Sequence, residues 1–268
     1  MAHIIFQGKK IFYRLEGEGK PVILLHGFGE DGNIWNPQVE KLKKENSLII
    51  VDLPGSGQSE MLEGTRTLND YAEVVKAIVD KEIIKHEKEL FSLTGHSMGG
   101  YITLAFAEKY PELLNSFGLF HSSAFADDGQ KIETRKKGID FIKKNGAGSF
   151  LKTSIPNLFS EKTKQEKPEL IERLLNLANK TSSEALIQYY EAMILRPDRT
   201  SVLRSFTKPV LFIIGKNDPV IPLQASLQQS HLPAISSVHI LQNSGHAGMW
   251  EEENLSSAYL SNFLNAFA

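Results

Sequence analysis

Short apolar runs alternate along the chain with longer segments in which apolar residues recur every three or four positions. The short runs have the pattern of strands buried on both faces, and the longer segments have the pattern of amphipathic helices. Strands and helices in alternation predict an α/β fold, with a mainly parallel sheet and helices on both of its faces. The strand-like runs lie at residues 21–25, 47–51, 90–94, 116–120, 209–214 and 237–241.

The N-terminal residues and the segment after Thr67 add an edge and a cover to this sheet. Residues 1–7 and 11–15 flank a Gly8-Lys9-Lys10 turn, which predicts a pair of edge strands. Thr67 and Asp70 have the spacing of a capping box, and the residues that follow place their apolar side chains on one side. We therefore expect a helix that begins at Thr67 and covers the sheet.

The alternation stops in the middle of the chain. Residues 122–205 hold several stretches with helical periodicity, interrupted by glycines and prolines, and no convincing strand-like run. The sequence therefore predicts an α/β core made of residues 1–121 and 206–268, with residues 122–205 inserted as a helical cap, or lid.

Composition narrows the classes of protein that this chain can belong to. The 30 basic and 32 acidic residues give a formal net charge of −2, which offers no reason to expect nucleic acid or an anionic membrane as a partner. No apolar run reaches the roughly 18 residues of a membrane span, and the N-terminal residues lack the pattern of a signal peptide, so we expect a cytoplasmic protein.

The residue types also limit the chemistry. The absence of cysteine excludes disulfides, thiolate metal sites and a cysteine nucleophile. Histidines and carboxylates nowhere have the spacing of metal ligands, so neither a metal nor another cofactor is expected. A basic cluster in the middle segment could bind anions, but interspersed acidic residues favour a solvated helix face. This cluster consists of Lys131, Arg135, Lys136, Lys137, Lys143 and Lys144.

The pentapeptide Gly95-His96-Ser97-Met98-Gly99 is the strongest sign of catalysis. It directly follows an apolar strand-like run and precedes a long apolar segment with helical character. A Gly-x-Ser-x-Gly sequence between a strand and a helix is typical of a nucleophile elbow, in which a tight turn exposes the serine hydroxyl. Ser97 is therefore the candidate nucleophile.

A serine hydroxyl is a poor nucleophile at neutral pH, so this hypothesis requires a base and an acid that orients the base. Asp218 lies in a loop directly after the strand-like run 209–214, and His246 lies in a glycine-containing loop after the run 237–241. The order Ser, then Asp or Glu, then His, with the acid and the histidine in loops after later strands, is known for hydrolases with such an elbow, so Asp218 is the candidate acid and His246 the candidate base. Asp52 also ends a strand, but we expect it to anchor the turn that follows.

Five stretches of the chain carry a further signal, and they are His26–Gly29, Asp52–Ser59, Gly95–Gly100, Gly215–Pro222 and Gly245-His246 followed by Glu251. Taken together and in this order, they resemble the α/β-hydrolase superfamily over nearly the whole chain except the middle segment. Because its candidate nucleophile is serine, the chain is most similar to cap-bearing, esterase-like members rather than to haloalkane dehalogenases or epoxide hydrolases, which use aspartate.

The resemblance implies an oxyanion hole made of backbone N–H groups. The N–H of Met98, at the head of the helix after the nucleophile, would be one donor. The glycine-rich turn after the first central strand would bring the N–H of Phe28 to the same point. Donors of this kind stabilise the tetrahedral intermediate. We expect His26 to brace this turn, and His96 to point away from the nucleophile.

Several large side chains near these motifs are candidates for the wall of a substrate pocket, although large apolar residues are more often plain core. Met249 and Trp250 are the strongest of these, because they follow the candidate base closely. The candidates are Trp35, His121, Phe125, Met193, Met249 and Trp250.

These features predict a serine hydrolase that cleaves a small, partly apolar carboxylic ester through an acyl-enzyme. Other reactions on the same scaffold stay open, namely hydrolysis of carbon–carbon, thioester or lactone bonds, a lyase step and perhydrolysis. A ligand-sensing protein with little turnover is an alternative from another class, and the intact set of Ser97, Asp218 and His246 weighs against it.

Overall fold

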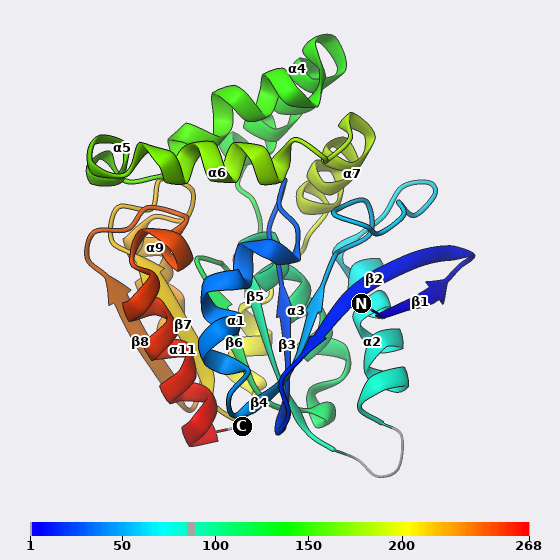
Figure 1. Ribbon diagram of the computed structural model, residues 1–268, viewed down its shortest axis with the longest axis vertical. Coiled ribbons are helices and arrows are strands. Elements are labelled where there is room, and N and C mark those ends of the chain that lie inside the picture. Colours follow the sequence, from blue (N-terminus) through cyan, green and yellow to red (C-terminus); the bar gives the residue numbers. More distant parts are fainter. Residues whose placement is uncertain (1, 85–88, 268) are drawn as a thin grey trace.

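A single mixed sheet runs through the molecule in the computed structural model, which describes residues 2–84 and 89–267. Its strands follow the order β1-β2-β4-β3-β5-β6-β7-β8 (Figure 1). The two N-terminal strands are antiparallel, and every pairing from β4 to β8 is parallel. The strands are β1 (Ala2–Phe6), β2 (Lys9–Glu16), β3 (Lys20–Leu25), β4 (Asn46–Val51), β5 (Phe91–His96), β6 (Leu114–Phe120), β7 (Val210–Gly215) and β8 (Ser236–Leu241).

The predicted α/β fold with a mainly parallel sheet is confirmed. Each of the six apolar runs lies within two residues of an observed strand, because strands covered on both faces need continuous apolar sequence. The strands β5 and β7 are buried along their whole length. The predicted edge pair is also present, although β2 already begins at Lys9 and Met1 lies outside the described residues.

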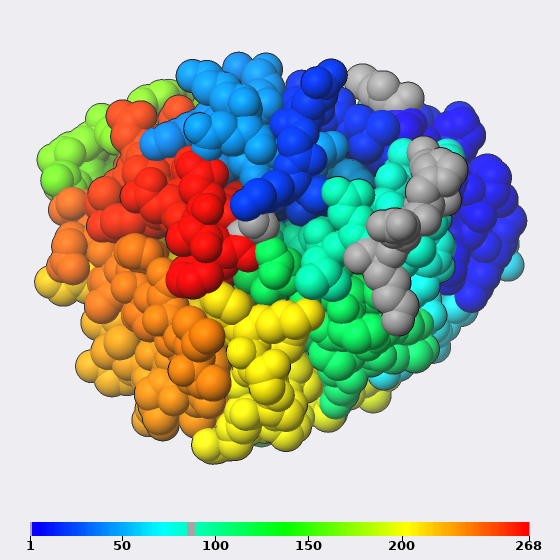
Figure 2. All heavy atoms as spheres, turned by 90° about the horizontal axis from the view of Figure 1, so that it is seen from below, coloured from blue at the N-terminus to red at the C-terminus, as the bar shows by residue number. Residues whose placement is uncertain are grey.

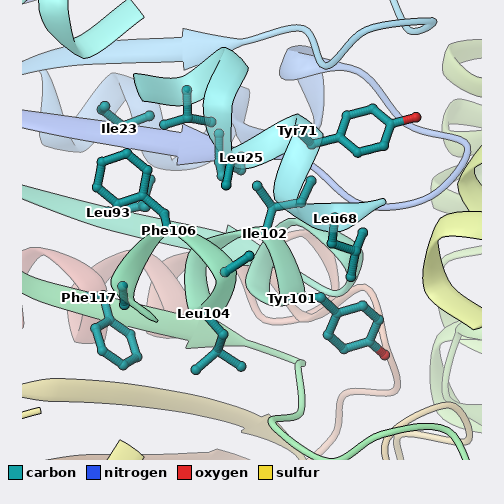
Figure 3. Close-up of a cluster of buried hydrophobic side chains, with 14 of the residues drawn as sticks. Ile23, Leu25, Leu68, Tyr71, Leu93, Tyr101, Ile102, Leu104, Phe106 and Phe117 are labelled. Carbon is teal, nitrogen blue, oxygen red and sulfur yellow. The ribbon is translucent and has the colours of Figure 1, made fainter. Parts of the chain in front are cut away.

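Helices cover both faces of the sheet and enclose a hydrophobic core on each. On one face, α2 (Leu68–Glu82) packs on α3 (Met98–Lys109), and Figure 3 shows Phe106 of α3 beside Leu93 of the sheet. The predicted capping box is present, since the Thr67 N–H donates to the Asp70 carboxylate at 2.7 Å.

On the other face, α1 (Asn36–Leu42) packs against the C-terminal helix α11 (Glu253–Phe267). Figure 2, which views the molecule from below, shows these two helices side by side at the end away from α4 to α7. Two shorter helices, α9 (Leu223–Ser230) and α10 (Gly248–Glu251), follow the strands β7 and β8. Within the described ranges, no helix has the length and apolar character needed to cross a membrane.

Residues 122–205 form helices and no strand. The helices are α4 (Gly129–Ser154), α5 (Glu161–Glu166), α6 (Pro168–Ala178), α7 (Ser183–Ile194) and α8 (Thr200–Ser205), with a 3-10 turn at Ile155–Leu158. Two further 3-10 turns, Gly32–Trp35 and Pro111–Leu113, lie outside this segment. In Figure 1 the helices α4 to α7 lie above the carboxyl ends of the strands. The helix α4 is interrupted at Gly146, whose φ is +80°. The helix α8 instead contacts α3 and buries Val202 and Leu203 in the core.

Candidate active site

Ser97 lies on a sharp turn between β5 and α3, at the carboxyl edge of the sheet. Its backbone has φ +50° and ψ −115°, a conformation that costs a non-glycine residue free energy. The flanking glycines make this turn feasible: a Cβ at Gly95 would overlap the backbone of Gly99, and a Cβ at Gly99 would lie 2.6 Å from the carbonyl oxygens of Leu25 and His26. The local sequence therefore allows a turn that leaves Ser97 at the head of α3.

The loops after β7 and β8 bring the predicted acid and base to this serine. The Nε2 atom of His246 lies 2.8 Å from the Oγ atom of Ser97. The Nδ1 atom of the same ring lies 2.8 Å from the Oδ2 atom of Asp218. All three side chains are at least nine-tenths buried. The structure thus joins into one hydrogen-bonded chain three residues that are far apart in sequence.

The Asp218 carboxylate is held as an anion. Its Oδ1 atom accepts hydrogen bonds from the backbone N–H groups of Val220 at 2.8 Å and Ile221 at 2.9 Å. Burial alone would raise the pKa of this carboxyl, but the electrostatic attraction and hydrogen bond of the His246 ring hold the pKa well below its usual range. An ionised carboxylate only accepts, so Nδ1 of His246 carries a proton. The lone pair of Nε2 then faces the Ser97 hydroxyl, as a general base requires.

His121 lies behind the acid rather than on the wall of a pocket. Its Nδ1 atom accepts the backbone N–H of Gly215 at 3.0 Å and lies 3.3 Å from Oδ2 of Asp218. Burial lowers the pKa of His121 to about 4, so the ring is uncharged at neutral pH. Its contacts brace the loop that presents Asp218.

The glycine-rich turn after β3 lies against Ser97. A Cβ at Gly27 would be 3.2 Å from Cβ of Ser97. Within the described chain, the backbone N–H groups of Phe28 and Met98 have no hydrogen-bond partner. His26 links this turn to the segment after β4, since its Nε2 atom accepts the Leu53 N–H at 2.9 Å. An oxyanion hole needs unpaired donors near the nucleophile, so the N–H groups of Phe28 and Met98 stay the predicted donors.

His96 has a defined place that the sequence did not indicate. Its Nδ1 atom lies 2.9 Å from Oε2 of Glu30, and its Nε2 atom lies 2.9 Å from the carbonyl oxygen of His246. Because both partners are acceptors, both ring nitrogens carry protons and the ring is charged. Burial would lower the pKa of His96, but the Glu30 carboxylate raises it above its usual value. The Glu30 carboxylate also accepts the Gly27 N–H at 2.7 Å, so this pair ties the loop of His246 to the turn after β3.

Glu251 also holds the loop of His246 in place. Its Oε1 atom accepts the Gly245 N–H at 2.8 Å, and its Oε2 atom accepts the Ser160 N–H at 2.9 Å. The N–H of His246 itself donates to the carbonyl of Leu158 at 2.6 Å. The middle segment therefore holds the loop that carries the candidate base.

A small cavity of about 120 Å³ opens onto Ser97 and His246. The helices α4 and α7 supply much of its wall, including Arg135, Tyr190 and Met193. Pockets for drug-sized ligands typically measure roughly 300 to 1,000 Å³, so this one suits a small group. A larger hollow of about 550 Å³ between α3 and α8 contains none of the three triad residues.

Of the six predicted pocket residues, the structure places only Met193 on this cavity. Trp35 and Met249 are fully buried in the core beneath α1, and Trp250 donates its indole N–H to the Ile34 carbonyl at 2.8 Å. Phe125 contributes its carbonyl oxygen to Arg196. The side chains of Trp35, His121, Phe125, Met249 and Trp250 do not line this cavity, because nearness in sequence to a motif does not fix the direction of a side chain.

Of two further side chains, Asp52 takes the role that the sequence predicted and Arg135 does not. Asp52 anchors its turn as expected: it accepts the N–H groups of Gly32 and Gln58, both at 2.9 Å. Arg135, predicted on a solvated face, turns inward and lines the cavity. Among the described residues, no group of three or more His, Asp or Glu side chains could hold a metal ion.

A parallel sheet with helices on both faces, and a Ser-His-Asp chain assembled at its carboxyl edge, define the α/β-hydrolase class of protein. The family model for the alpha/beta hydrolase fold matches residues 20–253, so the chain belongs to this family and is a hydrolase.

Curated relatives and solved structures agree with this assignment. The chain is 27% identical to a 2-hydroxy-6-oxononadienedioate/2-hydroxy-6-oxononatrienedioate hydrolase of Pseudomonas putida, covering 95% of this chain and 91% of that protein. It is 26% identical to an (E)-2-((N-methylformamido)methylene)succinate hydrolase of Acinetobacter baylyi, over 87% and 86% of the two chains. A thermophilic esterase from Thermogutta terrifontis, solved with malate bound, superposes with a TM-score of 0.92 at 26% identity, over 99% and 98% of the chains.

Proposed function

We propose that this protein is a serine hydrolase that cleaves a small carboxylic ester through an acyl-enzyme. The observation that carries the proposal is the continuous chain of hydrogen bonds from Asp218 through His246 to Ser97, at the mouth of a small cavity. The structural similarity to the Thermogutta terrifontis esterase supports ester chemistry.

In this mechanism Ser97 Oγ attacks the ester carbonyl while Nε2 of His246 takes the hydroxyl proton. The backbone N–H groups of Phe28 and Met98 stabilise the negative charge on the carbonyl oxygen. The bond to the alcohol then breaks, and His246 gives its proton to the departing oxygen. A water molecule, deprotonated by His246 in turn, cleaves the acyl-enzyme and releases the acid. The Asp218 carboxylate orients His246 and stabilises its charged form throughout.

Residues 122–205 act as a cap in this proposal. The helices α4 and α7 wall the cavity, and the turn before α5 holds the loop of His246 through Leu158. A cap of this kind excludes water from the reacting groups and limits the size of the substrate.

Hydrolysis of a carbon–carbon bond is the second candidate. The named substrate of the Pseudomonas putida relative has a ketone and two carboxylates but no ester, so its hydrolysis breaks another bond. The same serine, base and oxyanion donors could serve either reaction, since the fold alone does not select the chemistry. A lactonase is a related variant, because a lactone is a cyclic ester.

Two assays test these proposals. A fluorophosphonate probe should label Ser97 in the native protein and should not label the Ser97→Ala variant. Absence of labelling would contradict the nucleophile assignment and favour a ligand-sensing protein. A panel of small esters and lactones, run beside a 2-hydroxy-6-oxo-dienoate, then separates the chemistries. Turnover of the dienoate alone would contradict ester cleavage and support carbon–carbon bond cleavage.

The rate should depend on pH through a single proton. We expect kcat/KM for a neutral ester to be lower at acid pH, because a general base must be unprotonated to accept the hydroxyl proton of Ser97. Asp218 stays ionised and His121 stays uncharged above about pH 4, so neither adds a second step. The measurement is kcat/KM between about pH 5 and pH 8, with an ester whose chemistry limits the rate. A flat profile would remove His246 from the role of base.

Met193 should set the length of acyl chain that the cavity accepts. Its replacement by alanine removes part of the wall and so enlarges the cavity. The ratio of kcat/KM for longer over shorter acyl chains should therefore rise by about 10- to 200-fold, the discrimination that one methylene of pocket shape provides. Phe125→Ala is the matched control, because Phe125 lies in the same segment but does not line the cavity. An unchanged chain-length profile in Met193→Ala, together with a lower melting temperature, would assign Met193 to the core alone.

A further inference from the structure

Arg135 brings a positive charge to the wall of the candidate active site. Its side chain is 14% exposed, and it lines the same cavity as Ser97 and His246. It also lies 5.6 Å from the ring centroid of Tyr190, another lining residue. A cation in a small, largely buried cavity is costly unless it is paired, so its partners decide what the cavity favours.

The charges around Arg135 do not cancel within the described chain. Its Nε atom lies 2.6 Å from Oδ2 of Asp127, but the same carboxylate also binds Nη1 of Arg196 at 2.8 Å. The side chains of Asp127 and Arg196 are 0% and 3% exposed. Burial would raise the pKa of the Asp127 carboxyl, but the hydrogen bond of Arg135 keeps that pKa below its usual value. Two guanidinium groups therefore share one carboxylate, which leaves one positive charge in excess.

Other ionised groups near the cavity do not supply the missing anion. Glu30 lines the cavity, but its carboxylate is paired with the charged ring of His96. The Asp218 carboxylate is directed at His246 and at the backbone of its own loop. On Arg135, Nε and Nη2 bind Asp127, whereas Nη1 has no partner in the described part of the chain. Arg135 thus keeps one nitrogen of its guanidinium group without a protein partner, on a side chain that lines the cavity.

We propose that the substrate carries a carboxylate on its acyl side, and that Arg135 binds this carboxylate while Ser97 attacks the ester carbonyl. The proposal rests on the proposed function and names its substrate class, a half-ester of a short dicarboxylic acid. A singly charged anion balances the excess charge of the cluster, and the cavity of about 120 Å³ limits the acyl chain to a few carbon atoms. A guanidinium group is well suited to a carboxylate because it offers planar, directional N–H donors.

A matched pair of esters isolates the effect of charge. Monomethyl succinate and methyl 4-methylpentanoate have acyl groups of the same branched shape, but only the first ends in a carboxylate. We expect the native protein to favour monomethyl succinate in kcat/KM by roughly 10- to 100-fold, the range of a hydrogen bond to a charged group. Arg135→Gln should reduce this ratio to near one, and Arg135→Lys should retain part of it.

Lys136→Gln is the matched control. Lys136 follows Arg135 on the same helix, is exposed and does not line the cavity, so its loss removes the same charge without changing the preference. Arg135→Gln should fold, because Asp127 keeps its ion pair with Arg196, and a melting curve checks this. If Arg135→Gln folds and keeps the native ratio, Arg135 does not bind the carboxylate.

Binding to an inactive protein separates this proposal from the proposed function. Calorimetry with Ser97→Ala should show tighter binding of monomethyl succinate than of its neutral partner, and Arg135→Gln in that background should abolish the difference. Equal turnover of both esters by the native protein would overturn the carboxylate proposal and leave the serine hydrolase intact. Cleavage of neither ester, with charge-selective binding retained, would instead overturn ester hydrolysis and support the carboxylate site.

Discussion

Replacing Ser97 or His246 with alanine should lower kcat for ester hydrolysis by about 10³- to 10⁶-fold without unfolding the protein. In the proposed mechanism Ser97 supplies the attacking oxygen and His246 takes its proton, so either loss removes the covalent route. The double variant should be scarcely slower than either single one, because the two side chains act as a unit through their 2.8 Å hydrogen bond. The measurement is kcat for each variant on one ester, beside its melting temperature.

The pattern of losses is as informative as their size. Multiplicative losses in the double variant would mean that Ser97 and His246 act independently, which contradicts a nucleophile–base pair. Retention of most activity in Ser97→Ala would contradict the acyl-enzyme mechanism. The residual rate in these variants reports what the oxyanion donors and the cavity contribute without the serine.

Asp218→Asn should cost about 10⁴-fold in kcat while leaving the volume of the side chain unchanged. The amide can donate a hydrogen to Nδ1 of His246, which would leave the ring proton on Nε2 and remove the acceptor that Ser97 needs. The part of the rate that the N–H groups of Phe28 and Met98 supply should remain, because Asp218→Asn does not affect them.

Asp52→Asn is the matched control for this variant. Asp52 also ends a strand of the sheet, but its carboxylate binds the backbone of Gly32 and Gln58 and makes no hydrogen bond to His246 in the described residues. We expect its replacement to affect stability more than kcat. Near-full activity in Asp218→Asn, with a large loss in Asp52→Asn, would move the role of the acid to Asp52.

The charged pair of His96 and Glu30 shows how the fold constrains the reacting groups. Both side chains are almost completely buried, and each binds a segment that carries part of the site. Glu30 holds the turn of the candidate oxyanion donor Phe28 through Gly27, and His96 holds the loop of His246 through its carbonyl oxygen. Buried polar networks of this kind are strongly orienting when every member is satisfied.

The sequence could predict the sheet because its signal is local and repeated. A strand covered on both faces needs a continuous apolar run, as in β5 and β7, and such a run is visible without any knowledge of contacts. The turn at Ser97 is equally local, since only glycine fits at positions 95 and 99. The candidate acid and base could be predicted because each lies in a loop directly after a strand-like run and follows Ser97 in the order Asp, then His.

The wall of the cavity could not be predicted in the same way. Met249 and Trp250 follow His246 closely, yet the chain turns into α10 and directs both side chains into the core beneath α1. Arg135 lies in a run of charged residues whose composition resembles a solvated face, yet it binds Asp127 and lines the cavity while Lys136 beside it is exposed. Helical position decides which of two neighbours faces inward, and composition does not record it.

The amino-acid sequence by itself therefore determined the order of the strands along the chain, the elbow at Ser97 and the loops of Asp218 and His246, since each depends on residues adjacent in sequence. Only the tertiary structure decided that Arg135, Tyr190 and Met193 surround the serine, and that His96 is charged between two acceptors. These features depend on where separate segments meet, and that packing is set by the whole fold rather than by any one segment.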